Sequence, residues 1–269
     1  MPINTTWTAG HNPLLELSPD QRRMRLGAVP PSGEPTLAER ETDAARRAAS
    51  EPIDVALPNS IDWRNHNGGN YISCVKDQGA CGSCVAFGSA ATIDGAMRVI
   101  DGAPLWTTKG NKLHDVSEAQ LYYCSKTHND QHNCASGWWP TAALTYAHST
   151  GLAPDSCFPY TAGDQPCHLC ANWQTMVTKV GNTSSLNSPN AMRQWLATKG
   201  PLITCFTVYD DFFSYQSGVY IRHNNTVAGG HCVCVVGYSN GLNAWVCKNS
   251  WGPLWGIGGF LDWIWAVWD

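Results

Sequence analysis

Charged side chains are scarce in this chain, and long apolar runs are absent from it. Only 14% of the 269 residues are charged and 43% are hydrophobic, which excludes wholesale disorder. The formal net charge of −4 is too small and too evenly spread to indicate a nucleic-acid or anionic-membrane partner. No apolar run reaches the roughly 18 residues that a membrane-spanning helix needs, so we expect no membrane span.

The first part of the chain lacks cysteine and lysine, and the rest nearly lacks glutamate. Residues 57–269 hold all 12 cysteines, every tryptophan except Trp7, and a single glutamate, Glu118. We therefore expect two units, 1–56 and 57–269. So many cysteines indicate either disulfides and an oxidising compartment or metal binding. The first residues show no signal-peptide pattern, so we expect either that such a peptide was removed or that export takes another route.

Local patterns predict two helices in the first unit. Ser18 before Pro19, with Gln21 three positions after the serine, is typical of a helix start, and Gly27 predicts its end. The stretch 37–50 is rich in alanine, glutamate and arginine, which predicts an exposed helix.

The second unit changes from helical to β patterns along its length. Helices are predicted at 84–100, 117–124 and 140–149. Strands are predicted at 202–209, 217–222, 231–238 and 244–250, and on a last strand carrying Trp263, Trp265 and Trp268. Residues 237–241 predict a hairpin turn. This order indicates an α+β fold with two lobes and a cleft between them.

A cysteine at the start of a helix is the strongest chemical signal. Cys84 follows Gln78-Gly79-Ala80-Cys81-Gly82-Ser83 and begins the predicted helix 84–100. Free N–H groups and the helix dipole favour a thiolate there, and the thiolate is the nucleophilic form. The side chain of Gln78 and a nearby backbone N–H are suited to bind an oxyanion.

A nucleophile needs a base, and the base needs a group that orients it. His231 begins one predicted strand and Asn249 ends the next, so the hairpin places them side by side. Trp251 then shields their hydrogen bond from water.

These residues resemble the papain-like cysteine peptidases, and the cathepsin B branch most. The resemblance rests on Cys81-Gly82-Ser83-Cys84, Gly230-His231, Lys248-Asn249-Ser250-Trp251 and Phe206-Thr207-Val208-Tyr209. It implies Cys84 as nucleophile, His231 as base, Asn249 as its orienting group and Gln78 as oxyanion donor. It also implies a helical lobe at about 57–165, a β-barrel-like lobe at about 166–269, and no cofactor or metal.

The resemblance assigns the remaining parts of the chain as well. Residues 1–56 become an inhibitory propeptide that lies in the cleft and is released by cleavage near Leu57-Pro58. The implied partners are peptide or protein substrates and the chain's own propeptide. We expect a monomer in a secreted or lysosome- or vacuole-like compartment. The expected substrate-binding residues are Gly82, Gly137, Trp138, Trp139, Cys205, Gly230, Cys232 and Trp251.

Three departures from the family pattern bear on specificity. Val85 replaces the usual tryptophan, and Gly137-Trp138 stands where the family has two glycines. Only 12 residues separate Cys157 from Cys170, too few for the cathepsin B occluding loop, so we expect an endopeptidase. Cys205 and Cys232 are expected to line the pocket for the P2 side chain and to favour an apolar one.

The resemblance implies the disulfides Cys81–Cys134, Cys124–Cys167 and Cys157–Cys170. Cys205, Cys232, Cys234 and Cys247 are expected as buried small side chains on strands, with Cys234 and Cys247 facing each other across the hairpin. Zinc binding by Cys81, Cys84, Cys167 and Cys170 is an alternative with the right spacing. The other histidines are expected to be solvent or packing residues: His11, His66, His114, His128, His132, His148, His168 and His223.

The preferred hypothesis is thus the zymogen of a cysteine endopeptidase that forms an acyl-enzyme on Cys84. A peptide ligase on the same fold is one alternative, motivated by Val85 and Gly137-Trp138. A weakly active binding homologue is another, although Cys84, His231, Asn249 and Gln78 are all present.

Overall fold

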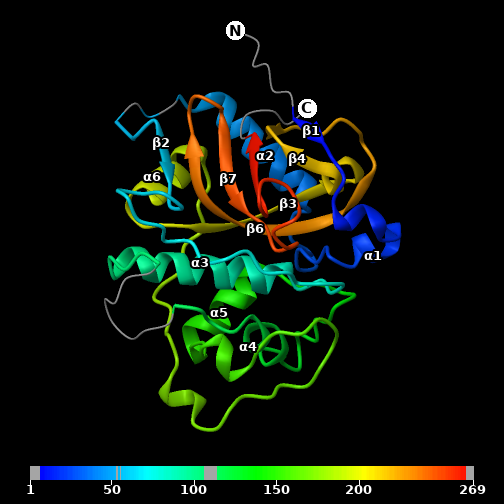
Figure 1. Cartoon of the computed structure of the whole chain (residues 1–269), viewed down its shortest axis with the longest axis vertical. Coiled ribbons are helices and arrows are strands. Elements are labelled where there is room, and N and C mark those ends of the chain that lie inside the picture. The colour runs from blue at the N-terminus through cyan, green and yellow to red at the C-terminus, as the bar shows by residue number, and fades with distance from the viewer. Residues whose placement is uncertain (1–6, 53, 55, 106–113, 265–269) are drawn as a thin grey trace.

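One long helix, α3 (Cys84–Ile100), lies between a β-sheet and a layer of shorter helices (Figure 1). The computed structural model describes residues 7–52, 54, 56–105 and 114–264. The helical layer contains α4 (Glu118–Tyr123), α5 (Pro140–Thr150) and the 3₁₀ turns η2 (Asp155–Cys157) and η3 (Trp173–Thr175). Both α4 and α5 pack against α3.

The sheet is built around the long strand β6 (Val227–Ser239). Its strand order is β2 (Ser60–Asp62), β6, β7 (Ala244–Lys248), β8 (Phe260–Ile264) and β5 (Val219–Tyr220), and β3 (Leu202–Tyr209) also pairs with β6. All pairings are antiparallel except β5 with β8. Helix α6 (Pro189–Thr198) packs on β3 and β6. The described strands form an open sheet, not the barrel-like closure that we expected.

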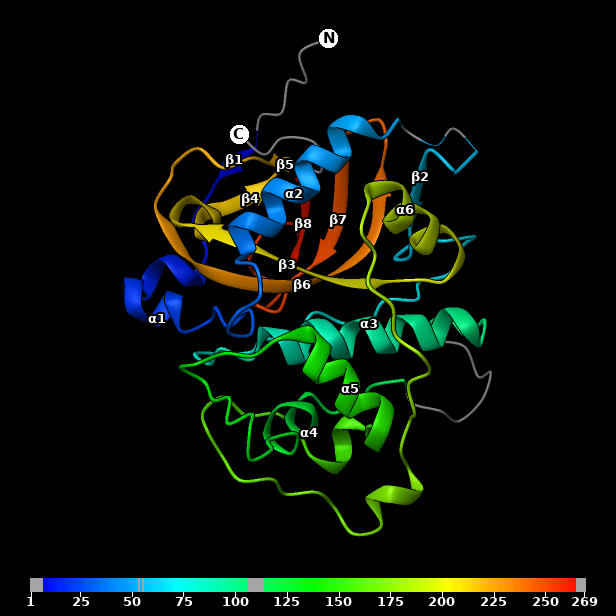
Figure 2. The ribbon, with the colours of Figure 1, turned by 180° about the vertical axis from the view of Figure 1, so that it is seen from behind.

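The N-terminal segment, residues 7–52, lies along the sheet side of the molecule. It contains β1 (Thr8–Ala9), η1 (Pro13–Glu16), α1 (Pro19–Arg23) and α2 (Leu37–Ser50). Strand β1 pairs with β4 (Tyr215–Ser217), which follows the 3₁₀ turn η4 (Asp210–Ser214). Helix α2 packs against β3 and crosses the sheet (Figure 2).

Local signals predict several elements to the residue. Helices 37–50 and 84–100 and strand 202–209 are confirmed. The capping box of Ser18 and Gln21 starts α1 as predicted. The predicted end at Gly27 is wrong, because the helix stops at Arg23 and the chain continues through turns closed by Arg25 N–H and Leu26 N–H.

The predicted hairpin turn at 237–241 is wrong in position. Gly237 lies inside β6, and the turn falls after Ser239, before β7. A Cβ atom on Gly237 would lie 2.1 Å from the carbonyl oxygen of Ile61, so this glycine serves the close approach of β2 to β6. Pairing with β2 also places residues 60–62 in the sheet, although we expected them in the helical lobe.

Helix α3 approaches the sheet closely at Gly88, which is buried and faces β3 and β6. A Cβ atom on Gly88 would lie 3.1 Å from Cδ1 of Ile203 on β3, which leaves room for little more than hydrogen. This contact brings the N-terminal half of α3 against β6, the strand that carries His231.

Four disulfides link the described residues. Cys81–Cys134, Cys124–Cys167 and Cys157–Cys170 agree with the pairing that the resemblance implied. The fourth, Cys205–Cys232, corrects the expectation of two unpaired buried thiols, because β3 and β6 pair these residues directly. Cys234 and Cys247 are free and buried but do not face each other, since their partners in the register are Lys248 and Val235.

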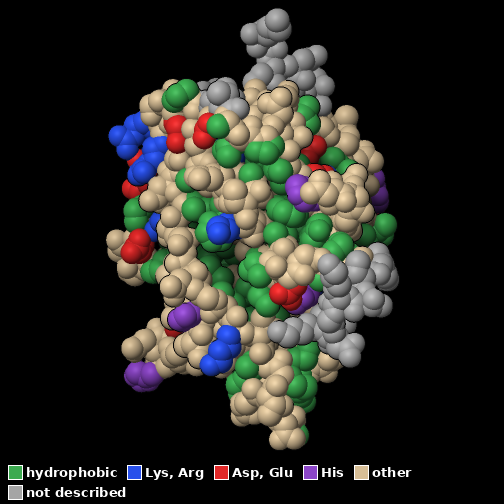
Figure 3. Space-filling model, turned by 90° about the vertical axis from the view of Figure 1, so that its left-hand side faces the viewer, with side chains coloured by type: hydrophobic (Ala, Val, Ile, Leu, Met, Phe, Trp, Pro, Cys, Tyr) green, Lys and Arg blue, Asp and Glu red, His purple; other side chains and the backbone are tan. Residues whose placement is uncertain are grey.

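Some expectations concern residues and properties outside these elements. Trp263 is buried on β8, whereas Trp265 and Trp268 lie outside the described residues. Over the part of the chain that the structure describes, no helix is both long and apolar enough to cross a membrane. The face in Figure 3 carries few charged side chains among many hydrophobic and uncharged ones.

Candidate active site

Cys84 is the first residue of α3 and is fully buried. The preceding Ser83 is held by a 2.8 Å hydrogen bond between its hydroxyl and that of Tyr160. Burial raises the pKa of the Cys84 thiol to about 11. The backbone groups of Cys232, Gly27 and Val85 hydrogen-bond to the sulfur and partly offset that rise. Gly27 belongs to the N-terminal segment, so this segment helps to enclose the sulfur.

The sheet brings His231 and Asn249 together as predicted. Nε2 of His231 lies 2.7 Å from Oδ1 of Asn249, and the Trp251 ring lies 4.6 Å from the imidazole. All three residues are buried. The Nδ1 atom of His231 has no hydrogen-bond partner among the described residues, so this nitrogen is available to exchange a proton with a thiol.

Burial sets the protonation state of this histidine. Burial, helped by the nearby Arg25 guanidinium and opposed by the hydrogen bond to Asn249, lowers the pKa of His231 to about 4. The enclosed site therefore favours a neutral thiol and a neutral imidazole near pH 7.

Gln78 is fully buried, and its amide is held at both ends. Its Oε1 accepts a 2.6 Å hydrogen bond from the Ser250 hydroxyl, which aims the Nε2 group in the opposite direction. Nε2 donates to the carbonyl of Cys81 at 2.8 Å and to that of Arg25 at 3.0 Å. A carbonyl of the N-terminal segment thus occupies the donor that we expected to bind an oxyanion.

The N-terminal segment forms main-chain hydrogen bonds with both walls of the cleft. On one wall, the carbonyl of Gly27 accepts from Trp138 N–H at 2.7 Å, and Val29 N–H donates to the carbonyl of Trp138 at 3.0 Å. On the other wall, Ala28 N–H donates to the carbonyl of Gly230 at 3.0 Å. The cleft therefore binds an extended backbone.

Two glycines make this close approach possible. Gly137 has a φ of 69°, and a Cβ atom on it would lie 2.4 Å from the carbonyl oxygen of Gly27. A Cβ atom on Gly82 would lie 2.8 Å from the carbonyl oxygen of Cys134. A larger residue at either position displaces backbone atoms at the cleft.

An open groove lies beneath α2. Its volume is about 1390 Å³, and the predicted residues Trp139 and Cys205 line it. Apolar side chains of α3 and α5 make up part of its wall, including Ile93, Met97 and Leu144. Arg40 of α2 lies over the Trp139 ring at 5.1 Å.

The zinc alternative is wrong. Cys81, Cys167 and Cys170 form disulfides with other partners, so their sulfurs are not metal ligands. Within the described residues, no group of three or more histidine, cysteine or acidic side chains is placed to hold a metal ion.

Two contributors to the site escaped the sequence analysis. Ser250 was read as part of a motif, without the role of holding Gln78. His132 is a packing residue, one of the two roles expected for it, and it is buried and hydrogen-bonded next to the wall residue Trp138, a position that the sequence did not indicate. Only the spacing of Asp130 and His132 was a local signal for this contact.

Comparison with known proteins decides the family. Residues 57–266 match the family described as papain family cysteine protease. This chain belongs to that family. The papain-family region thus begins where the cysteine-free first unit ends and includes Cys84, His231, Asn249 and Gln78.

Relatives and solved structures agree with this membership. Pro-cathepsin H of Mus musculus is 36% identical over 212 residues, which are 76% of this chain and 59% of that protein. Cathepsin B-like CP3 of Giardia intestinalis is 36% identical over 219 residues, 76% of this chain and 68% of that protein. The papain-family assignment is therefore firm, while equal identity to cathepsin H and cathepsin B relatives does not separate the branches.

The fold comparison includes the N-terminal segment. The structure of proCathepsin B S9 from Trypanosoma congolense has a TM-score of 0.71 and 24% identity, covering 96% of this chain and 87% of that one. That of procathepsin L2 from Tenebrio molitor has a TM-score of 0.68 and 27% identity, covering 96% and 79%. Both similarities extend beyond the matched papain-family region, so the first unit also follows a procathepsin fold.

Proposed function

We propose that this papain-family chain is the zymogen of a cysteine endopeptidase. The observation that carries the proposal is the pairing of His231 with Asn249 beside a cleft that holds a peptide backbone on both walls. A base oriented by a carboxamide, a cysteine at a helix start and a cleft for extended peptides are together the requirements of peptide-bond hydrolysis through a thiol.

The reaction follows from the placement of these groups. Nδ1 of His231 takes the proton of Cys84, whose sulfur attacks the peptide carbonyl carbon, and the oxygen becomes an oxyanion bound by Gln78 Nε2 and the N–H of Cys84. The C–N bond then breaks, and His231 gives its proton to the leaving amine. Water, deprotonated by His231, attacks the thioester, the C–S bond breaks, and the thiol and the product acid are released.

The N-terminal segment acts as the inhibitor of this site. Its Arg25 carbonyl accepts a hydrogen bond from Gln78 Nε2. Its Gly27 carbonyl and Ala28 N–H form hydrogen bonds with the main chains of Trp138 and Gly230. Cleavage near Leu57-Pro58, which follows the segment, frees the cleft. The mature enzyme then begins near the start of the papain-family region.

Specificity follows from the groove beneath α2. Its wall includes Ile93, Met97 and Leu144, and the Cys205–Cys232 disulfide adds an apolar surface close to the site. This supports a preference for an apolar P2 side chain. The short connection between Cys157 and Cys170, closed by their disulfide, leaves no room for an occluding loop and supports endopeptidase action.

The four disulfides also bear on where the enzyme works. Disulfides persist in oxidising surroundings, so they support a secreted protein or a lysosome- or vacuole-like compartment. We propose that the enzyme acts as a monomer, because one chain carries Cys84, His231 and Asn249 together.

The direct test uses the full chain after cleavage of the segment. Hydrolysis of internally quenched peptides with varied P2 residues should fall by a factor on the order of 10⁴ or more in Cys84→Ala. Cys74→Ser, which changes an exposed free thiol, is the matched control. Turnover that persists in Cys84→Ala would refute the proposal. Mass analysis of products with an added amine separates hydrolysis from ligation.

A further inference from the structure

Trp138 presents its backbone to the cleft while its side chain points into the protein. Its N–H and carbonyl bond Gly27 and Val29, as described above, and its side chain is only 5% exposed. A glycine could provide the same backbone groups without any anchor. The buried indole therefore anchors this backbone through the residues that it contacts.

Two residues hold the indole. Its Nε1–H donates to Oδ2 of Asp130 at 2.7 Å, and its ring stacks on His132 with the centroids 4.2 Å apart and the planes 20° apart. Asp130 also accepts from His132, since its Oδ1 lies 2.8 Å from Nδ1 of the ring. One carboxylate thus bonds both aromatic side chains.

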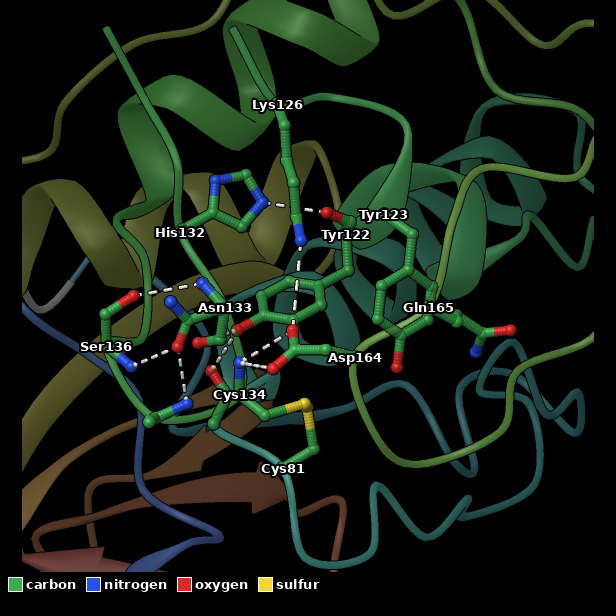
Figure 4. A network of polar contacts seen from close by, with 12 residues as sticks. Cys81, Tyr122, Tyr123, Lys126, His132, Asn133, Cys134, Ser136, Asp164 and Gln165 are labelled. Atoms are coloured by element: carbon green, nitrogen blue, oxygen red, sulfur yellow. Dashed lines mark hydrogen bonds and ion pairs between the residues drawn. A yellow bond between two sulfur atoms is a disulfide. The ribbon is translucent and has the colours of Figure 1, made fainter. Parts of the chain in front are cut away.

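The other edge of His132 meets a second acceptor. Its Nε2 lies 2.7 Å from the carbonyl oxygen of Tyr122 on α4 (Figure 4). The Asp130 carboxylate and the Tyr122 carbonyl thus hold both ring nitrogens of His132 and fix the plane of the imidazole against the indole of Trp138. The hydrogen bonds of this carboxylate to His132 and Trp138 also lower the pKa of Asp130.

The same network reaches the loop that precedes the nucleophile. The Tyr122 hydroxyl lies 2.7 Å from the carbonyl of Asn133 and 3.2 Å from that of Gly82. The next residue, Cys134, is held by its disulfide to Cys81 and by a hydrogen bond to Asp164, as Figure 4 shows. Hydrogen bonds of Tyr122 on α4 therefore hold both the loop before Cys84 and, through His132, the cleft wall at Trp138.

We propose that Asp130 and His132 are positioning residues that fix the backbone of Trp138 for pairing with the main chain of a bound peptide. They touch neither the peptide nor the reacting atoms. Their effect is on peptide affinity, through the orientation of the N–H and carbonyl of Trp138. The inference rests on the proposed function for substrates, but its effect on binding of the N-terminal segment is independent of catalysis.

The test uses the full chain cleaved near Leu57 and three variants. His132→Phe keeps an aromatic ring and removes both ring nitrogens, Trp138→Phe removes the indole N–H and shortens the stacked ring system, and Asp130→Ala removes the shared acceptor. Gln131→Ala, an exposed neighbour in the same loop, is the control. Three quantities are measured: KM and kcat for a peptide, the rate of Cys84 alkylation by iodoacetamide, and the Kd of a synthetic peptide of residues 7–52 from its protection against alkylation.

We expect KM and Kd to rise about tenfold in the variants, because a lost charge-assisted hydrogen bond frees the wall. Both kcat and the alkylation rate should stay within about twofold, since the small reagent needs no main-chain pairing. Unchanged KM and Kd in Trp138→Phe would overturn the inference, and so would a fall in alkylation as large as the rise in KM. If His132→Phe fails to fold, Trp138→Phe decides. If the parent hydrolyses no peptide, the proposed function fails while the Kd comparison still decides this inference.

Discussion

A Cβ atom placed on Gly27 would lie 1.9 Å from the carbonyl oxygen of Gly82. The backbone of the N-terminal segment therefore touches the backbone of the nucleophile loop directly, two residues before Cys84. No side chain larger than hydrogen fits at this contact without displacing one of the two chains. The closeness of this contact explains how the segment seals the sulfur from solvent.

Gly27→Val should weaken inhibition by the segment. Overpacking of a tight contact costs about 1–3 kcal/mol, so the segment should bind about 5- to 150-fold more weakly. The measurement is peptidase activity after cleavage near Leu57, without separation of the segment. Ala49→Val, on the exposed surface of α2, is the control and should behave as the parent. Equal inhibition in both variants would show that the segment does not depend on this contact.

Gln78→Ala should lower kcat by about 10²- to 10³-fold with little change in KM, because an oxyanion donor acts mainly in the transition state. Ser250→Ala should have a smaller effect of the same sign, because it releases the 2.6 Å hydrogen bond that orients Gln78. Steady-state kinetics with one peptide substrate compare the two. A fall in kcat that is greater for Ser250→Ala than for Gln78→Ala would contradict this assignment.

Segment binding should weaken as the pH falls from about 6.5 towards 4. Burial and Arg25 of the segment lower the pKa of His231 to about 4, so removal of the segment should raise this pKa and let the uncovered site take up a proton more readily. Proton uptake by the uncovered form draws the equilibrium towards release. Gel filtration of the cleaved Cys84→Ala chain at each pH measures how much of the segment has dissociated. Tighter binding at pH 4.5 than at pH 7 would contradict it.

Glu41 should act against this pH dependence. Burial against the sheet raises the pKa of its carboxyl, so its protonation favours the bound segment. Glu41→Gln removes that opposing effect and should make the acid release steeper. Arg46→Ala is the control, since Arg46 pairs with Asp43 on the same helix. Identical pH profiles for Glu41→Gln and the parent would exclude this role.

Removal of the Cys205–Cys232 disulfide should destabilise the fold. The bond closes a loop with a sequence separation of 27, for which the chain-entropy treatment gives about 3.5 kcal/mol. The double variant Cys205→Ala/Cys232→Ala should therefore unfold at a lower guanidinium concentration than the parent. Cys74→Ser, at an exposed free thiol, should stay within about 0.5 kcal/mol. Equal unfolding midpoints for all three chains would show that this bond is absent or does not contribute to the free energy of unfolding.

The predictions that succeeded rest on local physics. The predicted capping box of Ser18 with Gln21 starts its helix through bonds between residues three apart, and helix 37–50 follows from its alanine, glutamate and arginine content. Helix 84–100 follows from residues within the helix itself. The predicted turn at 237–241 failed because Gly237 serves a contact with β2, about 175 positions earlier in the chain. A glycine alone does not tell a turn from a close approach.

The amino-acid sequence by itself determined helices 37–50 and 84–100, the cysteine at a helix start and the family to which the chain belongs, because these depend on neighbouring residues and short motifs. Only the tertiary structure decided that Arg25 occupies Gln78, that Cys205 bonds Cys232, and that His132 supports Trp138. The contact of Arg25 with Gln78 depends on the path of a segment 53 positions away, and the disulfide depends on the register of β3 and β6. No local pattern encodes either. The burial that shifts the pKa values of Cys84 and His231 also arises only from the tertiary packing.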